Sequence, residues 1–238
     1  MANFISGPIK YFLRRISRIY LGIVCAREHR RQVHAPNERT VEYRFVFDTL
    51  LRLAPRSVLD VGPGNSSLPH LMSICGFVVT ALDNIRDYWQ GSMFNRHFHV
   101  VDGDILAPRL DRKFELITCI SVLEHIEDHN LAMRNMLGLL EPGGHIALTV
   151  PYSEDRFVEN VYALPGAGFG KDVSYICRVF SRKEVDAWLS SNNAALVDQE
   201  YWKVYTGELH TFGQSIFPVE KNAVSSLHHL SCLLIKKP

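Results

Sequence analysis

Apolar runs and helical periodicities alternate along the chain from about residue 37 to residue 151. The apolar runs predict five strands: "SVLDVG" (57–62), "FVVTALD" (77–83), "HFHVVDGDI" (97–105), "KFELITCI" (113–120) and "HIALTVP" (145–151). The segments before and between them repeat apolar residues at helical spacing and predict helices at 37–57, 66–76 and 129–144. Such alternation is typical of a parallel, doubly wound sheet, in which ligands bind outside the carboxyl ends of the strands.

The pattern changes after Pro151. Residues 152–178 are rich in glycine, proline and aromatic residues, which predicts an inserted lid. A helix is expected at 180–192, where Ser181 and Glu184 form a capping box. Two final strands, 194–205 and 225–237, are expected to pair antiparallel at the sheet edge. The expected fold is therefore α/β, with a doubly wound, seven-stranded, mostly parallel sheet and an antiparallel edge hairpin.

The first 36 residues form an arm that differs in composition from the main domain, 37–238. Residues 1–34 are basic and contain a single acid, Glu28. Lys10, Arg14 and Arg18 occupy one face of a predicted helix. Another face carries apolar residues at helical spacing: Ile9, Phe12, Leu13, Ile16, Tyr20 and Ile23. Such an amphipathic helix either packs on the main domain or lies in a membrane interface. The arginine-rich, acid-poor composition is also that of organellar transit peptides.

The overall composition narrows the class of protein. Of the 238 residues, 47% are hydrophobic and 21% are charged, and the formal net charge is +1. A folded domain is expected, and its charge gives no support for a nucleic-acid partner. The five cysteines are scattered without a C-x-x-C pair, so we expect no disulfide framework and no metal site, in a reducing, cytoplasmic compartment. No apolar run is long enough to span a bilayer.

The stretch "VLDVGPGNSS" ends the first predicted strand in a loop that a nucleotide can approach closely. Gly62 and Gly64 provide backbone freedom, but Ser67 stands where a dinucleotide fingerprint has its third glycine. Asp83 ends the second strand about 20 residues later, where a carboxylate can hold ribose hydroxyls. Asp104 ends the third strand, where it can accept a hydrogen bond from an adenine amino group. These positions favour an adenosine-bearing cofactor, with NAD as an alternative.

Taken in order, five motifs resemble those of the class I S-adenosylmethionine-dependent methyltransferases. They are "VLDVGPG", "ALD", "DGDI", "FELITCISVLEHIED" and "LLEPGGHIALTVP", and the resemblance covers about residues 40–150. It implies a Rossmann-like fold that binds S-adenosyl-L-methionine and releases S-adenosyl-L-homocysteine. The cofactor-binding residues that it implies are Asp60, Gly62, Gly64, Asp83, Asp104, Ile105 and Ser121.

The resemblance also implies what each cofactor-binding residue contacts. The aspartate and the two glycines of the first loop would border the methionine part, and Asp83 would hold the ribose diol. Asp104, with the backbone of Ile105, would contact adenine, and Ser121 would line the cofactor pocket. Asp102 alternates away from the sheet end and is expected to be solvated or structural.

Methyl transfer to a hydroxyl group needs a base that removes the hydroxyl proton. The candidates near the strand ends are His125, which can instead shape the pocket, Tyr152 and His210. Glu124 is expected to be solvated or to cap a helix. In the His228–His229 pair the two side chains are expected on opposite faces of a strand, which argues against a shared metal ion.

The acceptor specificity is expected to come from the arm and the lid. The leading hypothesis is O-methylation of a small molecule or a glycan sugar by a cytoplasmic enzyme. One alternative uses the basic arm: a membrane-peripheral enzyme that methylates a lipid or a quinone. Another is a protein that binds S-adenosylmethionine without catalysing transfer.

Overall fold

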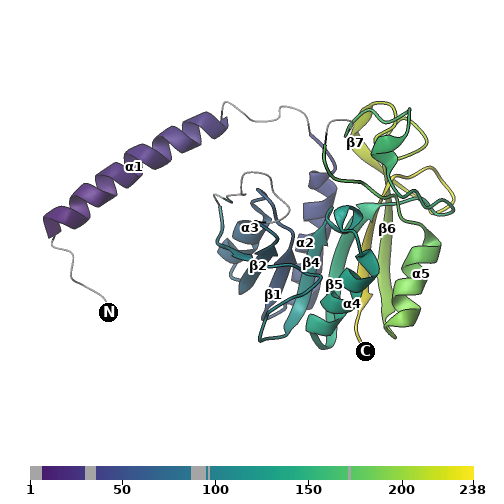
Figure 1. Cartoon of the computed structure of the whole chain (residues 1–238), viewed down its shortest axis with the longest axis horizontal. Helices are drawn as coiled ribbons and strands as arrows, with labels where there is room; N and C mark the ends of the chain where they lie inside the picture. The colour runs from purple at the N-terminus through teal and green to yellow at the C-terminus, as the bar shows by residue number, and fades with distance from the viewer. Residues whose placement is uncertain (1–6, 30–35, 87–94, 96, 171–172) are drawn as a thin grey trace. The chain divides into compact units, whose positions relative to one another are not determined.

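The chain divides into two compact units, Met1–Pro36 and Asn37–Pro238, which are described separately. The computed structural model describes residues 7–29, 36–86, 95, 97–170 and 173–238. In the first unit, α1 (Gly7–His29) is the helix that the apolar spacing predicts (Figure 1). Pro8 lies in its first turn, where a missing backbone N–H removes no intrahelical hydrogen bond.

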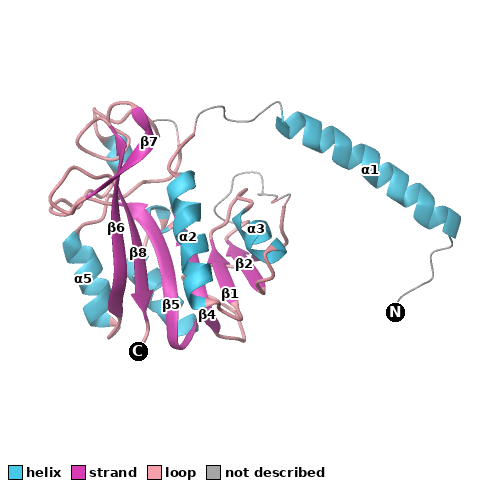
Figure 2. Cartoon of the chain, turned by 180° about the vertical axis from the view of Figure 1, so that it is seen from behind, coloured by secondary structure: helices cyan, strands magenta, loops and turns pink. Residues whose placement is uncertain are grey.

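The second unit is built on one sheet with the strand order β3-β2-β1-β4-β5-β8-β6-β7 (Figure 2). The strands are β1 (Val58–Val61), β2 (Val79–Asp83), β3 (Val100–Asp102), β4 (Phe114–Ile120), β5 (Leu140–Pro151), β6 (Ala195–Tyr205), β7 (Ser215–Asn222) and β8 (Leu230–Lys236). β1 to β5 are parallel, whereas β8 is antiparallel to both β5 and β6. The expected fold class is confirmed: a mostly parallel sheet with an antiparallel edge.

The expected number of strands was wrong, because the described residues form eight strands and not seven. The additional strand is β7, which pairs antiparallel with β6 at the outer edge of the sheet. Its sequence "SIFPVEKN" contains Pro218, whose missing backbone donor argues against a strand except at such an edge. The two predicted final strands do pair with each other, but β8 lies between β5 and β6.

Helices cover both faces of the sheet and enclose one apolar cluster on each (Figures 1 and 2). α2 (Arg39–Leu53) and α3 (Leu68–Ile74) pack on one face, and α4 (His129–Leu139) and α5 (Arg182–Ser191) pack on the other. Within β4, Leu116 belongs to the first cluster and its neighbour Ile117 to the second. Because both faces are covered there, the central strands β1 and β4 are mostly buried and mostly apolar rather than alternating.

The predicted lid contains a small apolar cluster of its own. The short helix η2 (Val161–Ala163) lies in this segment. Its cluster joins residues of the lid to the loop after β6: Val158, Val161, Cys177, Val179 and Leu209. The Gly168 N–H donates to the Thr211 carbonyl at 2.8 Å, which fastens the two segments to each other. The loops after β5 and after β6 therefore form one packed layer.

Candidate functional site

The loop after β1 has a backbone that glycine is suited to adopt. Gly62 and Gly64 have φ angles of 69° and 52°, in the left-handed region that side chains disfavour. A Cβ atom on Gly62 would lie 2.4 Å from Cγ1 of Val122 in the loop after β4. The two loops are therefore packed directly against each other at the carboxyl edge of the sheet.

Asp83 and the glycine loop, which the sequence singles out separately, are in contact. Asp83 ends β2 and is buried, and its Oδ2 accepts a hydrogen bond from the Gly64 N–H at 2.8 Å. Asn95, which sequence reasoning missed, holds the same loop: its side-chain amide donates to the carbonyls of Gly64 at 2.8 Å and of Ser66 at 2.9 Å. An asparagine outside any strand or helix gave no signal of this contact.

Asp60 is the buried acid of β1. Its Oδ1 accepts a hydrogen bond from the Thr118 hydroxyl at 2.5 Å, and burial raises the pKa of the carboxyl to about 7. Within the described residues, its Oδ2 is buried and has no hydrogen-bond partner. A buried acceptor of this kind matches a cationic donor, such as the amino group of an amino-acid moiety.

Asp102 and Asp104 take different roles at the end of β3, which ends at Asp102 and not at Asp104 as expected. Asp102 accepts a hydrogen bond from the Ile85 N–H at 3.1 Å and pairs with Arg86 at 2.9 Å, which gives it a structural role, one of the two that the sequence leaves open. Asp104 is half-buried and accepts from the Leu106 N–H at 2.8 Å. Ile105 is buried, and its carbonyl accepts from the side chain of Asn135 at 2.8 Å. α4 therefore fixes the turn that carries Asp104 and Ile105.

Ser121 belongs to a buried network that sequence reasoning missed. Its hydroxyl donates to Oε1 of Glu42, which also accepts from the Thr149 hydroxyl at 2.7 Å. Glu42 is fully buried on α2 and pairs with Arg39 at 2.8 Å. An acid within the apolar face of the helix, three residues before the buried Phe45, was the available signal.

His125, the first base candidate, lies in the short helix η1 (Leu123–His125) after β4. Its Nδ1 is 2.6 Å from the Ile176 carbonyl, so Nδ1 carries the proton and Nε2 keeps the lone pair. Burial lowers the pKa of the imidazole, which is therefore neutral near pH 7. Its ring meets Tyr175 edge-on, with centroids 4.8 Å apart.

Tyr152, the second candidate, is buried just after β5, and its contacts differ from those of His125. Its hydroxyl donates to Oε2 of Glu154 at 2.8 Å, and its ring stacks on His228 at 5.6 Å. Burial, together with the bond to Glu154, raises the pKa of Tyr152, so the hydroxyl keeps its proton near neutral pH. The structure thus gives it a packing role beside Arg182.

His210, the third candidate, is buried beside Tyr205, with ring centroids 5.1 Å apart. Burial lowers the pKa of its imidazole to about 3, and the charges of His229 and His125 act in the same direction. A ring with this pKa stays neutral at pH 7 and is a weak base. It can still accept a hydrogen bond.

His228 and His229 do not lie in a strand, where the sequence places them. His228 and His229 precede β8 rather than lying within it. His229 contacts the Gly207 carbonyl through Nε2 at 2.8 Å, whereas His228 stacks on Tyr152. Across the described part of the chain, no three histidine, cysteine or acidic side chains are grouped as a metal site.

The expectation for Glu124 was wrong. It is 2% exposed, so it is neither solvated nor free to cap a helix at the surface. Burial raises the pKa of its carboxyl to about 8, and the nearby Glu42 acts in the same direction. A charged residue in a loop gives no local sign of burial, because the atoms that cover it come from distant segments.

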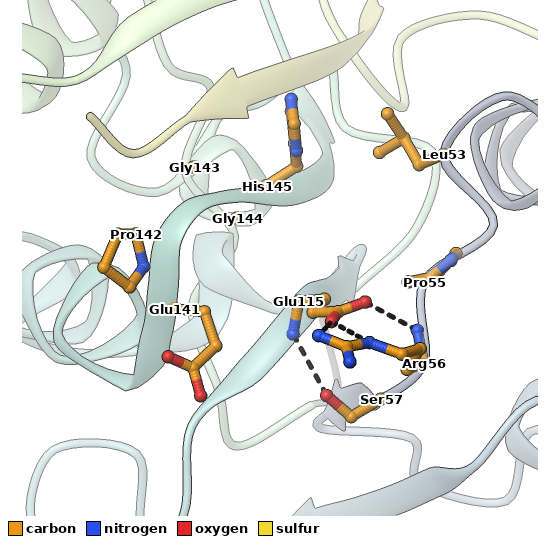
Figure 3. A pocket seen from close by; sticks show the side chains of 10 residues that line it. All are labelled: Leu53, Pro55, Arg56, Ser57, Glu115, Glu141, Pro142, Gly143, Gly144 and His145. Atoms are coloured by element: carbon orange, nitrogen blue, oxygen red, sulfur yellow. Dashed lines mark hydrogen bonds and ion pairs between the residues drawn. The ribbon is translucent and has the colours of Figure 1, made fainter.

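A pocket of about 640 Å³ lies at the opposite edge of the sheet, away from these residues (Figure 3). There Glu115, at the amino end of β4, accepts from the Arg56 backbone N–H at 2.7 Å and from its Nε at 2.6 Å. The Glu115 N–H donates to the Ser57 hydroxyl at 3.2 Å. None of the predicted site residues lines this pocket.

Comparison with known proteins gives one family match. A family model described as a methyltransferase domain matches residues 30–199. The "Ubiquinone biosynthesis O-methyltransferase" of Coxiella burnetii is 25% identical over 160 residues, which cover 62% of this chain and 67% of that protein. The protein of the same name from Xanthomonas euvesicatoria pv. vesicatoria is 32% identical over 124 residues, covering 49% and 51%.

Solved structures show the same fold at low identity. The 1,6-didemethyltoxoflavin-N1-methyltransferase of Burkholderia thailandensis, with S-adenosylhomocysteine bound, has a TM-score of 0.57 and 16% identity, and covers 100% of this chain and 93% of its own. The N-methyltransferase NodS of Bradyrhizobium japonicum WM9, also with S-adenosylhomocysteine, has a TM-score of 0.53 and 16% identity, covering 87% and 91%. These likenesses concern the architecture of the sheet and its helices.

Proposed function

Because the chain belongs to the methyltransferase domain family, we propose that it transfers a methyl group from S-adenosylmethionine to a hydroxyl group of a small molecule. The contact that carries this proposal is the hydrogen bond from Gly64 to Asp83, which joins the glycine loop to the acid after β2. The O-methyltransferase names of the curated relatives support a hydroxyl acceptor.

The residues at this edge fit S-adenosylmethionine. When bound, this cofactor supplies a methyl group on a positively charged sulfur. The buried, unpartnered Oδ2 of Asp60 suits its amino group, and the left-handed glycines allow close approach of the backbone. Asp83 would hold the ribose, the Asp104–Ile105 turn the adenine, and Ser121 the wall of the pocket.

The protein must then align an acceptor and take its proton. We place the acceptor between the loop after β4 and the lid, which we take as residues 152–178 of a domain spanning 37–238. Two candidates could accept a hydrogen bond there: His125, which keeps a lone pair on Nε2, and the neutral imidazole of His210. Tyr152 is less suited, since its hydroxyl proton is bonded to Glu154.

Ligand-dependent unfolding tests the cofactor. A ligand that binds the folded state raises the melting temperature by mass action. We expect S-adenosylhomocysteine to raise the melting temperature of the full chain and NAD to leave it unchanged. A rise with NAD alone would instead support a dehydrogenase. S-adenosylmethionine binding without methyl transfer to any of a broad set of hydroxyl and amine acceptors would favour a non-catalytic binding protein.

A second candidate is a membrane-peripheral enzyme that methylates a lipid or a quinone. The observation that favours it is α1, in which no acidic residue precedes Glu28 and an apolar stripe lies opposite lysine and arginine residues. Among the helices that the structure describes, none is long and apolar enough to cross a membrane. In this candidate, the amphipathic arm, residues 1–34, would attach the enzyme to the surface of the bilayer.

A further inference from the structure

Glu124 is a buried acid with an unused acceptor. Its side chain follows β4 in η1 and is 2% exposed. Its Oε2 is buried without a hydrogen-bond partner among the described residues, and its Oε1 lies 3.9 Å from Nε2 of His125. Buried polar atoms are nearly always paired, so an orphaned carboxylate oxygen indicates that something else completes the site.

The groups that face Glu124 from α2 and β4 do not neutralise it. Arg39 is the cation on this side, and its guanidinium is engaged with Glu42 at 2.8 Å. The charges of Glu42 and Glu38 oppose ionisation of Glu124. Cys119 of β4 is a buried thiol whose pKa burial raises well above its usual range.

The lid faces Glu124 with aromatic and thiol groups. Tyr162 and Cys177 lie within electrostatic range of its carboxyl, and burial raises the pKa of both above their usual values. Tyr175 lies edge-on to Tyr162, with centroids 6.3 Å apart. The lid side therefore offers aromatic rings to Glu124. Its cation Arg178 donates its backbone N–H to the Glu124 carbonyl at 3.1 Å, while its guanidinium pairs with Glu159 at 2.6 Å.

The same loop also contacts the glycine loop, which we propose to bind the methyl donor. Val122, two residues before Glu124, packs against Gly62 of the glycine loop. Ser121, one residue earlier, has a φ of 52°, which turns the chain sharply out of β4. Residues 121–124 thus carry both the contact with the glycine loop and the Glu124 side chain.

We propose that Glu124 is the catalytic residue that takes the proton of an aromatic hydroxyl group as that group is methylated. This inference rests on the proposed function. In the step, the acceptor oxygen forms a bond to the methyl carbon while the methyl–sulfur bond breaks and its electron pair stays on sulfur. The hydroxyl proton moves to Oε2 of Glu124, so charge and atoms balance.

The acidity of the acceptor hydroxyl favours an aromatic hydroxyl over a sugar hydroxyl, which the sequence analysis left as an alternative. Burial raises the pKa of Glu124 to about 8. A phenol titrates near pH 10, so proton transfer to Glu124 is unfavourable by only ~100-fold. An aliphatic hydroxyl, with a pKa close to the 15.7 of water, would make it unfavourable by roughly 10⁸-fold. The aromatic rings of the lid also suit a flat acceptor.

Glu124→Gln tests the role, since a glutamine has nearly the shape of a protonated glutamate. The matched control is Glu115→Gln, which removes a carboxylate from the other end of β4, in the pocket of Figure 3. The acceptors are phenol and catechol, with methyl glucoside as the aliphatic comparison. We expect Glu124→Gln to lower kcat with the phenols by at least ~100-fold at little change in KM. Glu115→Gln should stay within about twofold of wild type.

The pH dependence gives two further measurements. With ionised Glu124 as the base, wild-type kcat should rise about tenfold per pH unit up to about pH 8 and then level off. A raised carboxyl pKa keeps the folded state protonated where the unfolded state is ionised, so wild-type stability should fall from pH 5 to pH 8. The difference between the urea midpoints of wild type and Glu124→Gln should therefore decrease from pH 5 to pH 8. This measurement needs no substrate.

The outcomes separate this inference from the proposed function. If S-adenosylhomocysteine does not bind the wild type, the proposed function fails. If S-adenosylhomocysteine binds, three results would overturn the role of Glu124. They are no methylation of any phenol, a kcat of Glu124→Gln within threefold of wild type, and urea midpoints of wild type and Glu124→Gln that change equally with pH. If Glu124→Gln does not bind S-adenosylhomocysteine, Glu124→Asp replaces it in the test, because aspartate retains a carboxylate. The kcat of Glu124→Asp must then still rise with pH, and a kcat that does not change with pH would overturn the role of Glu124.

Discussion

At Gly62, two constraints on a single residue coincide. Its φ of 69° disfavours any side chain, and a Cβ atom would lie 2.4 Å from Val122. The first constraint is local to the glycine loop, and the second comes from the loop after β4, 60 residues further along the chain. The same residue therefore holds the shape of the glycine loop and its contact with the loop after β4.

We expect Gly62→Ala to destabilise the protein by about 2–3 kcal/mol, from left-handed strain plus the clash. Adding Val122→Ala should restore part of the loss, since it removes the clash and leaves the strain. Urea unfolding measures both, with Gly138→Ala as the control. Gly138 lies in α4 with nothing within 4 Å of a Cβ, so alanine there should be neutral or stabilising. Equal stability of Gly62→Ala and wild type would contradict this account.

Residues of the site differ in how far the sequence reveals them. Gly62 and Asp83 stand at the ends of apolar runs, so a local pattern places them at one edge of the sheet. Glu124 and Asn95 have no such pattern, because their burial depends on segments that pack on them from elsewhere. The base candidates that the sequence offers, His125, Tyr152 and His210, therefore stay predictions, and Glu124 is a proposal that only its burial in the fold could suggest.

At the scale of elements, local signals were reliable where they were strong. α5 begins at its predicted capping box, in which Glu184 accepts from the Ser181 N–H at 3.0 Å. β7 was missed because the proline in its sequence argues against a strand, and its place at the sheet edge cannot be read locally. The partners of β8 were also beyond local reading, since strand order is decided by packing of the whole sheet.

α1 carries the prediction for the membrane candidate. Ile16 lies on the apolar stripe of α1, whereas Ser17 lies on the polar face. Ile16→Asn should lower binding to vesicles of phosphatidylserine and phosphatidylcholine by about tenfold or more, the loss expected for one buried isoleucine. Ser17→Asn is the matched control and should bind like wild type.

Co-sedimentation of the full chain with these vesicles measures both variants. Vesicles of phosphatidylcholine alone should bind less, because they lack the negative charge that attracts the basic face. If wild type does not sediment with anionic vesicles, or if the two variants bind equally, α1 is not a membrane-binding helix.

At the scale of the whole molecule, the parallel sheet explains why the site residues meet. β1, β2 and β4 run in one direction, so the glycine loop, Asp83 and the loop after β4 all emerge at one edge. The alternation of strands and helices predicted this convergence from the sequence. How the lid and the loop after β6 pack above it was not predictable, because residues 152–178 show no regular period.

Calorimetry with S-adenosylhomocysteine tests the central claim that this edge holds the methyl donor. Asp83→Ala should weaken binding by about 1–3 kcal/mol, the scale of a lost hydrogen bond to a charged group. Asp102→Ala is the control, since Asp102 pairs in register with Asp83 on β3 but is engaged with Arg86. We expect a weaker complex for Asp83→Ala and an unchanged one for Asp102→Ala. An unchanged affinity for Asp83→Ala would contradict the claim.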